Sequence, residues 1–298
     1  MRSRFSRRAL LRASALGVGA WGLAKSVFAG PGDREFQLSL NERSLQRALS
    51  SGRVDHLDLA KTARTLCDLP AVEYVSHFFA DRAQDEAYLK DMNKRAAEYN
   101  VRQLLIVVHG EGRLGAPNPG DRKKAVSNHR KWLVAAEALG CHSIEVDTHS
   151  EGTPEEQLGR VAEGLAALCE DADKHHINVL AGCRSRPSRD AGWLLQVIRK
   201  AGHSACGALP SFAGLAASQR DEDIAALLKL AKGMSADARD FDAQGRETQI
   251  DFFRIVSAIV SNGYRGYVGI AYQGGELGEL EGILATKTLL ETARRFSE

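Results

Sequence analysis

The 298-residue sequence lacks several features that mark particular protein classes. Its cysteines form no CxxC pair and show no zinc-finger spacing, which excludes the common cysteine-rich metal sites. No proline- or serine-rich linker divides residues 30–298, and no sequence repeat is evident there. We therefore predict one large domain whose thiols are mostly small buried side chains. The thiols are those of Cys67, Cys141, Cys169, Cys183 and Cys206.

A long apolar run is also missing near the N-terminus. The weakly apolar stretch Ala13–Ala24 is too short and too rich in glycine and alanine to span a bilayer comfortably. It lies between a twin-arginine pattern, Ser6–Arg12, and a small-x-small cleavage signal, Val27–Ala29. We therefore predict a twin-arginine signal peptide over residues 1–29, export by the twin-arginine machinery to the periplasm, and no stable membrane anchor.

The chain has little excess charge of either sign, with a formal net charge of +2 at pH 7. Residues 1–29 contribute six positive charges and no negative one, so the remainder carries a net charge of −4. A mildly acidic domain lacks the basic surface that attracts the phosphate backbone. We therefore expect no nucleic-acid partner.

What the sequence does contain is eight short apolar runs that alternate with helix-like stretches. Such runs, rich in Val, Ile or Leu without polar alternation, fit parallel strands buried on both faces. One helix start is marked by a capping box at Thr153 and Glu156, with proline at the first helical position. The pattern predicts an α/β fold, a single eight-stranded parallel (β/α)8 TIM barrel over residues 30–298. We place the strands at Phe36–Leu40, Ala71–Ser76, Gln103–Val108, His142–Asp147, Ile177–Gly182, Ala205–Leu209, Gly233–Ala236 and Gly266–Tyr272.

The segments at the strand ends carry a resemblance to a known family. Sites in such barrels lie at the C-terminal ends of the strands. Together these segments resemble the xylose-isomerase-like TIM barrels, also called the sugar phosphate isomerase/epimerase family. The segments are Val72–Val75, Leu105–Gly112, Asn128–Trp132, Leu139–Ile144, Ile177–Ser188, Cys206–Leu215, Phe241–Asp242, Gly266–Gly275 and Glu281–Lys287.

The resemblance implies a sugar isomerase or epimerase that uses a divalent metal such as Mn or Mg. Family members carry Glu-Asn-His after the fifth strand, Leu-Pro-Asp-Phe after the sixth and Ile-Glu-Tyr-Glu-Gly at the eighth. This chain has Gly182, Ser211 and Ala271 where the resemblance places two acid/base glutamates and a metal aspartate. Proton transfer next to a carbonyl needs a base and a group that stabilises the enediolate. We therefore predict no metal or other cofactor, and a mouth without negatively charged oxygens to hold a cation.

The favoured hypothesis is an exported family member that has lost the metal-dependent chemistry and still binds a sugar-like or anionic ligand. Guanidinium groups after the fifth and seventh strands could replace the charge of the cation and grip a carboxylate or phosphate. The alternative for these arginines is a solvated loop, or pairing with Asp237 or Asp240. The candidate ligand-binding residues are Arg184, Arg186, Arg239, Tyr272 and Gln273.

Two other functions stay open at this point. An active isomerase or epimerase could use a relocated site beyond the third and fourth strands, because imidazole and carboxylate groups there could hold a metal. A non-catalytic interaction or scaffold protein would instead have its mouth filled by side chains such as Arg184 and Phe212. Nothing in the sequence selects an oligomeric state. The candidates for the relocated site are His109, Glu111, Asp147 and His149, with His77 and Glu145 nearby.

Overall fold

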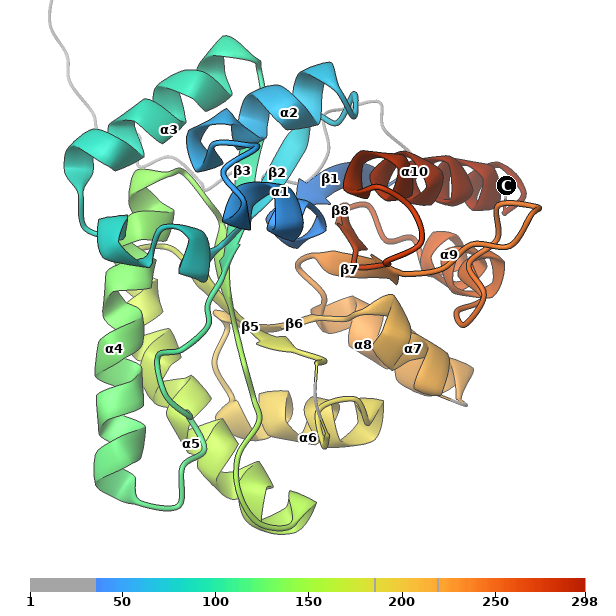
Figure 1. The fold of residues 1–298 in the computed structure, drawn as a ribbon. Helices are drawn as coiled ribbons and strands as arrows, with labels where there is room; N and C mark the ends of the chain where they lie inside the picture. The colour runs from blue at the N-terminus through green and yellow to red at the C-terminus, as the bar shows by residue number, and fades with distance from the viewer. Residues whose placement is uncertain (1–35, 185, 219, 298) are drawn as a thin grey trace, which may run out of the picture.

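A computed structural model describes residues 36–184, 186–218 and 220–297. In it, parallel strands surround a central axis and helices lie outside them (Figure 1). The predicted signal peptide over residues 1–29 lies outside the described residues. None of the described helices is long and apolar enough to cross a membrane.

The strands and helices alternate along the described chain. The strands are β1 (Gln37–Asn41), β2 (Ala71–Val75), β3 (Arg102–Val107), β4 (Ser143–Val146), β5 (Asn178–Gly182), β6 (Cys206–Leu209), β7 (Met234–Ala238) and β8 (Tyr267–Tyr272). The α-helices are α1 (Gln46–Ser50), α2 (Leu59–Thr65), α3 (Glu86–Glu98), α4 (Pro119–Ala138), α5 (Pro154–Asp173), α6 (Ala191–Ala201), α7 (Phe212–Ala217), α8 (Asp221–Leu230), α9 (Phe252–Ser261) and α10 (Glu279–Arg295). Four short 3-10 turns are η1 (Glu42–Leu45), η2 (His56–Asp58), η3 (Ser76–Phe78) and η4 (Ala80–Arg82).

The sheet has the strand order β6-β5-β4-β3-β2-β1-β8-β7, and every ladder in it is parallel. The two end strands meet through an isolated bridge between Ser211 and Ser235, where Ser235 N donates to Pro210 O at 2.9 Å. This is the predicted (β/α)8 TIM barrel. All eight predicted strands are present, with ends displaced by one or two residues.

Local sequence signals explain where the outer helices begin. Thr153 Oγ1 accepts a hydrogen bond from Glu156 N, and Glu156 Oε2 accepts one from Thr153 N, so the predicted capping box starts α5. On α4, His129 and Trp132 face the core and are buried, as the helical spacing predicts. These helices cover the outer face of the strands.

The inner face of the barrel carries both an apolar cluster and a set of polar side chains. The apolar part is a small cluster separate from the main core: Val75, Leu105, Val107, Leu180 and Leu209. The polar part comes from β1, β2, β4 and β7, and its members are Ser39, Asn41, Glu73, Glu145, Ser235 and Asp237. Because side chains alternate across a strand, these polar groups are directed to the axis while their neighbours face the helices.

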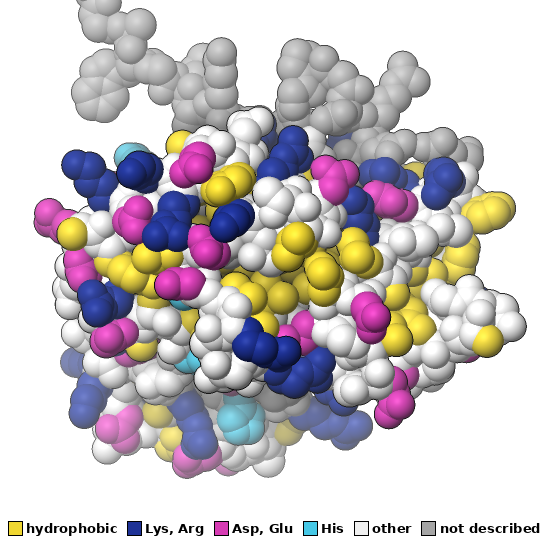
Figure 2. All heavy atoms as spheres, turned by 45° about the horizontal axis from the view of Figure 1, so that its top comes forward, with side chains coloured by type: hydrophobic (Ala, Val, Ile, Leu, Met, Phe, Trp, Pro, Cys, Tyr) yellow, Lys and Arg dark blue, Asp and Glu magenta, His cyan; other side chains and the backbone are white. Residues whose placement is uncertain are grey.

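The surface mixes charges of both signs. Figure 2 shows Lys and Arg interspersed with Asp and Glu over the face it presents, where no extended area of one sign is visible. Salt bridges on the described surface, such as Arg82–Asp85 and Arg130–Asp171, join neighbouring opposite charges. On that face, charge patterning therefore does not mark a docking site.

Two glycines on α5 test the packing of this helix. A Cβ added to Gly164 would overlap the carbonyl oxygen of Leu114, whereas one added to Gly159 meets nothing closer than Lys200 Cε at 3.9 Å. We expect Gly164→Ala to lower the free energy of unfolding by about 2–3 kcal/mol through overpacking. Gly159→Ala should raise it by about 0.5–1 kcal/mol, since alanine favours a helix. Urea unfolding measures both, and equal effects would contradict the described packing.

Candidate functional site

A cavity of about 520 Å³ opens at the C-terminal ends of the strands, the end at which the barrel rule predicts a site. Its walls come from β1, β4 to β8 and the loops that follow them. Side chains that line it include Asn41, Arg43, Glu145, Cys183, Arg184, Ser211, Ser235, Asp237, Arg239, Glu247, Ala271 and Gln273. The mouth is therefore open and strongly polar.

The prediction of a mouth without negatively charged oxygens is wrong. Glu145, Asp237 and Glu247 line the cavity, and Glu73 lies buried on the inner face of the barrel. These carboxyl groups are supplied by β2, β4, β7 and the loop after β7. The positions that the resemblance indicates, 182, 211 and 271, lie instead at the ends of β5, β6 and β8. The question is what each carboxyl group binds.

Glu145 is bound by Arg184. Arg184 Nε donates to Glu145 Oε1 at 2.6 Å and Arg184 Nη2 donates to Glu145 Oε2, so the pair is bidentate. The Glu145 side chain is 2% exposed and that of Arg184 is 24% exposed. Burial disfavours the charge of Arg184, but the carboxylate of Glu145 outweighs this and raises the pKa of the guanidinium.

This ion pair occupies the space above Gly182. A Cβ added to Gly182 would overlap Glu145 Oε1, so the glycine leaves the room that the Glu145 carboxylate fills. The resemblance places a glutamate at position 182. In this chain a carboxylate from the neighbouring strand, already paired with an arginine, stands there instead.

His109 joins two arginines at the mouth. Its Nε2 lies 2.8 Å from Arg43 Nη2 and 3.1 Å from Arg184 Nη1. Because a guanidinium only donates hydrogen bonds, Nε2 is an acceptor and the imidazole is neutral. Burial and the charges of the two arginines lower the pKa of His109 to about 4. The Nε2 lone pair is therefore occupied, and it is free neither to bind a metal nor to accept a proton from a ligand.

Glu73 is held at the base of the site by two donors from β1. Ser39 Oγ donates to Glu73 Oε1 at 2.7 Å, and Asn41 Nδ2 donates to Oε2 at 2.9 Å. Burial raises the pKa of Glu73 from 4.5 to about 7, although these two hydrogen bonds oppose the rise. The carboxyl also covers Gly269 of β8, where an added Cβ would overlap it.

Asp237 stands on β7 and is the least satisfied of the carboxyl groups. Its Oδ1 accepts a hydrogen bond from Ser235 Oγ at 3.4 Å, but its Oδ2 is buried and has no partner within hydrogen-bond geometry among the described residues. Burial raises the pKa of Asp237, and the nearby backbone N–H of Ala213, the Ser211 hydroxyl and the charges of Arg184 and Arg43 oppose the rise. Ser211 lies near it and accepts a hydrogen bond from Gly214 N at 3.0 Å, which caps α7.

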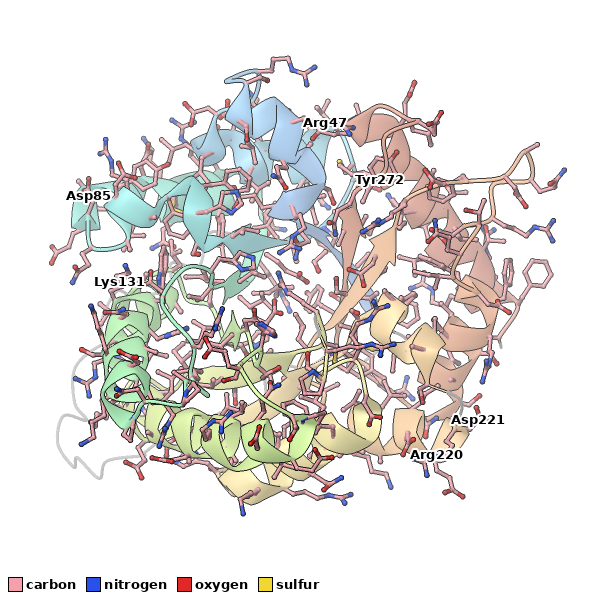
Figure 3. All side chains as sticks on the ribbon, turned by 60° about the horizontal axis from the view of Figure 1, so that its bottom comes forward. Arg47, Asp85, Lys131, Arg220, Asp221 and Tyr272 are labelled. Atoms are coloured by element: carbon pink, nitrogen blue, oxygen red, sulfur yellow. The ribbon has the colours of Figure 1, made fainter. Side chains whose placement is uncertain are left out.

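The structure does not bring the four candidates for a relocated site together. Glu111 accepts a hydrogen bond from Trp132 Nε1 at 2.8 Å and pairs with Lys131 at 2.7 Å, on α4 at the outside of the barrel (Figure 3). Asp147 and His149 are exposed, and Asp147 Oδ1 accepts a hydrogen bond from His149 N. Only His109 of the four is hydrogen-bonded to residues that line the cavity.

Across the described part of the chain, no three His, Cys, Asp or Glu side chains are grouped so that they could hold a metal ion. The cavity itself contains carboxylates that are paired with arginine or held on separate strands. The thiol of Cys183 also lines it, but burial raises its pKa to about 12, so it is protonated at neutral pH. The donor set therefore does not fit a divalent cation.

Three of the predicted ligand-binding residues line the cavity and two do not. Arg184, Arg239 and Gln273 are in its wall. Arg186 is exposed and lies outside the lining. The side chain of Tyr272 is turned toward α10, where its hydroxyl lies 3.3 Å from both the N and O atoms of Leu277 (Figure 3).

The mouth is not filled by the two side chains named for the scaffold hypothesis. Arg184 lies in the cavity wall, and Phe212 is buried against Phe252 with ring centroids 5.0 Å apart. Phe212 therefore belongs to the core beneath α7 and α9. The space at the mouth remains available to a ligand.

Sequence reasoning missed Arg43, Asn41 and Glu73. Arg43 lies in η1, directly after β1, so the rule that chemistry follows the strand ends would have included it. Glu73 interrupts the apolar run of β2, and a carboxyl group in such a run is itself a signal of a buried polar site. Both signals were present in the sequence.

Comparisons with known proteins agree with the barrel fold. A family model described as xylose isomerase-like TIM barrel matches residues 67–295. Three solved structures share the fold: L-ribulose 3-epimerase (15% identity, TM-score 0.69, covering 88% of this chain and 97% of that one), D-psicose 3-epimerase with D-tagatose from Clostridium cellulolyticum H10 (13%, 0.68, 88% and 98%), and the IolI protein with a zinc atom (14%, 0.71, 88% and 99%). No curated protein matches the chain in sequence.

The buried carboxyl of Glu73 makes stability depend on pH. Its folded-state pKa of about 7 lies above 4.5, so its favourable contribution is complete below pH 4.5 and is lost as the pH rises through 7. We expect the unfolding free energy of the wild type to fall, relative to that of Glu73→Gln, by at most about 3 kcal/mol between pH 4.5 and 7.5. Urea unfolding across this range measures the difference.

The exposed residue Glu98 offers a matched control for this experiment. Glu98→Gln should follow the wild-type profile, because a solvated carboxylate has little to gain or lose by burial. Parallel profiles for the wild type and Glu73→Gln would contradict the assignment of a raised pKa to Glu73.

Proposed function

The chain belongs to the xylose isomerase-like TIM barrel family, and we propose that it binds a small sugar-like anion at the barrel mouth without the family's metal-dependent isomerase or epimerase chemistry. The solved structures that share its fold include sugar epimerases, which supports a ligand of sugar-like size. The twin-arginine pattern of residues 1–29 supports export to the periplasm as part of the same proposal.

The bidentate Arg184–Glu145 pair above Gly182 is the observation that carries this proposal. The resemblance places an acid/base glutamate at position 182, beside the cation. In this chain an arginine supplies a positive charge, and the carboxylate beside it is already neutralised. A carboxylate held by two charge-assisted hydrogen bonds is a poor base and a poor metal ligand.

The remaining groups also favour binding over proton transfer. The Nε2 atom of His109 accepts hydrogen bonds from two arginines, and Glu73 is buried on β2 with both oxygens engaged. Positions 211 and 271 carry a hydroxyl and a methyl group. Arginine-rich walls around an open polar cavity are suited to holding an anion in place.

The metal question has a direct test. We expect the purified mature protein to contain no stoichiometric divalent metal by elemental analysis and to show no Mn²⁺ binding by calorimetry. A variant with Gly182→Glu, Ser211→Asp and Ala271→Glu should still bind Mn²⁺ poorly, because Glu145 and Arg184 occupy the space at position 182. Adding Glu145→Ala and Arg184→Ala to these three should recover Mn²⁺ binding. One equivalent of tightly bound Mn²⁺ in the wild type would refute the proposal.

The binding question is tested by thermal shift. We expect D-gluconate or D-glucose 6-phosphate to raise the melting temperature, and neutral D-sorbitol to have a much smaller effect. Arg184→Ala alone should lower the unfolding free energy by about 3–5 kcal/mol, since it leaves Glu145 buried and unpaired. Arg184→Ala with Glu145→Ala should recover part of that stability and still respond weakly to the anions. A wild type that responds to neither anion would contradict a binding function.

A further inference from the structure

Arg43 and Arg184, two of the four arginines that line the cavity, differ in how their charges are balanced. Arg184 is paired with Glu145, whereas Arg43 has no carboxylate within ion-pair distance among the described residues. The Arg43 guanidinium donates a hydrogen bond to the neutral His109, and the Arg43 side chain lines the cavity. Burial and, to a smaller extent, the charge of Arg184 lower the pKa of Arg43, while the charges of Glu145 and Asp237 oppose the fall. Four arginines (Arg43, Arg184, Arg189 and Arg239) and three carboxyl groups (Glu145, Asp237 and Glu247) line the cavity, so its lining carries an excess of one positive charge when all are ionised.

Asp237 has a carboxyl oxygen that lacks a hydrogen-bond donor among the described residues. This oxygen, Oδ2, is buried and belongs to a side chain that lines the same cavity. A buried acceptor left without a donor costs free energy, and native structures rarely retain one without a reason. A ligand hydroxyl would supply the missing donor.

The strand register places these two groups around one small residue. β8 lies between β1 and β7; Leu40 pairs with Ile270, and Asp237 pairs with Ala271. Arg43 follows β1 closely, so it and Asp237 approach the space above Ala271 from opposite sides. Neighbouring strands are about 4.8 Å apart, so this space is about 10 Å wide between the outer two backbones. The methyl group of Ala271 leaves it open.

We infer that the ligand of this cavity is a hydroxylated monocarboxylate, the class of the aldonic acids, with its carboxylate on Arg43 and a hydroxyl donating to Asp237 Oδ2. This inference rests on the proposed function and names its ligand class. The carboxylate would provide the counterion that Arg43 lacks, and the hydroxyl would satisfy the orphan oxygen of Asp237.

The charges of the mouth favour a monoanion over a phosphate. A phosphate monoester carries close to two negative charges at neutral pH. In this cavity those charges would meet an excess of only one positive charge, and Glu145 and Asp237 near Arg43 repel an anion when ionised. The exposed Arg239 at the rim lies beside Glu247, whose Oε1 accepts a hydrogen bond from Arg239 N. A single carboxylate matches the excess of one positive charge in the lining.

Calorimetry with three six-carbon probes separates the contributions. D-gluconate has both the carboxylate and the hydroxyls, D-sorbitol has the hydroxyls alone, and hexanoate has the carboxylate alone. We expect gluconate to bind at least about tenfold more tightly than either of the others, since each lacks one of the two recognised groups. D-glucose 6-phosphate tests whether the cavity prefers a phosphate to a carboxylate, and we expect it to bind more weakly than gluconate.

Variants of the two residues locate the contacts. Arg43→Gln should weaken gluconate binding at least about tenfold and leave sorbitol unchanged, and Arg43→Lys should give an intermediate loss. Arg265→Gln is the matched control, because Arg265 is an exposed arginine just before β8, at the opposite end of the barrel. It should leave gluconate binding unchanged.

Asp237→Ala should weaken gluconate binding by about three- to tenfold and leave hexanoate binding unchanged. The same variant should unfold at a higher temperature than the wild type in the absence of ligand, because it removes a buried oxygen without a donor. This second readout confirms that the variant folds and separates loss of a contact from loss of structure.

The outcomes distinguish this inference from the proposed function. Tight gluconate binding that depends on Arg43 and Asp237 supports both. Tighter binding of glucose 6-phosphate than of gluconate, or gluconate binding that Arg43→Gln does not weaken, overturns the hydroxy-acid inference and leaves an anion-binding function in place. Failure of gluconate and glucose 6-phosphate alike to bind overturns both.

Discussion

The ion pair between Arg184 and Glu145 sets the character of the barrel mouth. It joins the end of β5 to the inner face of β4, and both side chains are largely removed from water. Such a pair gains little net stability, but breaking it by removing one partner is expensive because a buried charge is left alone. The pair therefore fixes the position of the Glu145 carboxylate. Glycine at position 182, which has no side chain, leaves free the space that this carboxylate occupies.

The other polar groups of the mouth are arranged around this pair. Because Arg184 also donates to His109, the imidazole is kept neutral and its Nε2 is shared with Arg43. Glu73 remains below, held by donors from β1, and Asp237 remains across the cavity with an oxygen unsatisfied. Arginine side chains therefore place positive charge in the part of the cavity where the family resemblance places a metal cation. An anion can bind such a site without a metal.

The fold was predictable because its signals are local. Short apolar runs place each strand within one or two residues, and the Thr153 capping box gives the start of α5, since both depend on residues close in sequence. The glycine, serine and alanine at positions 182, 211 and 271 were equally visible. The carboxylate above Gly182 was not, because the Arg184–Glu145 pair joins residues 39 positions apart and depends on which face of β4 Glu145 occupies. The expectation of a mouth without carboxylates failed for this reason, whereas Glu73 and Arg43 carried signals that strand-end reasoning could have used.

The most direct measurement is a crystal structure of the mature protein soaked with Mn²⁺, with anomalous diffraction recorded at the manganese edge. The account predicts no anomalous peak at the mouth, with Arg184 still bound to both oxygens of Glu145. A manganese peak coordinated by Glu145 and Asp237, with Arg184 displaced from the carboxylate, would contradict it.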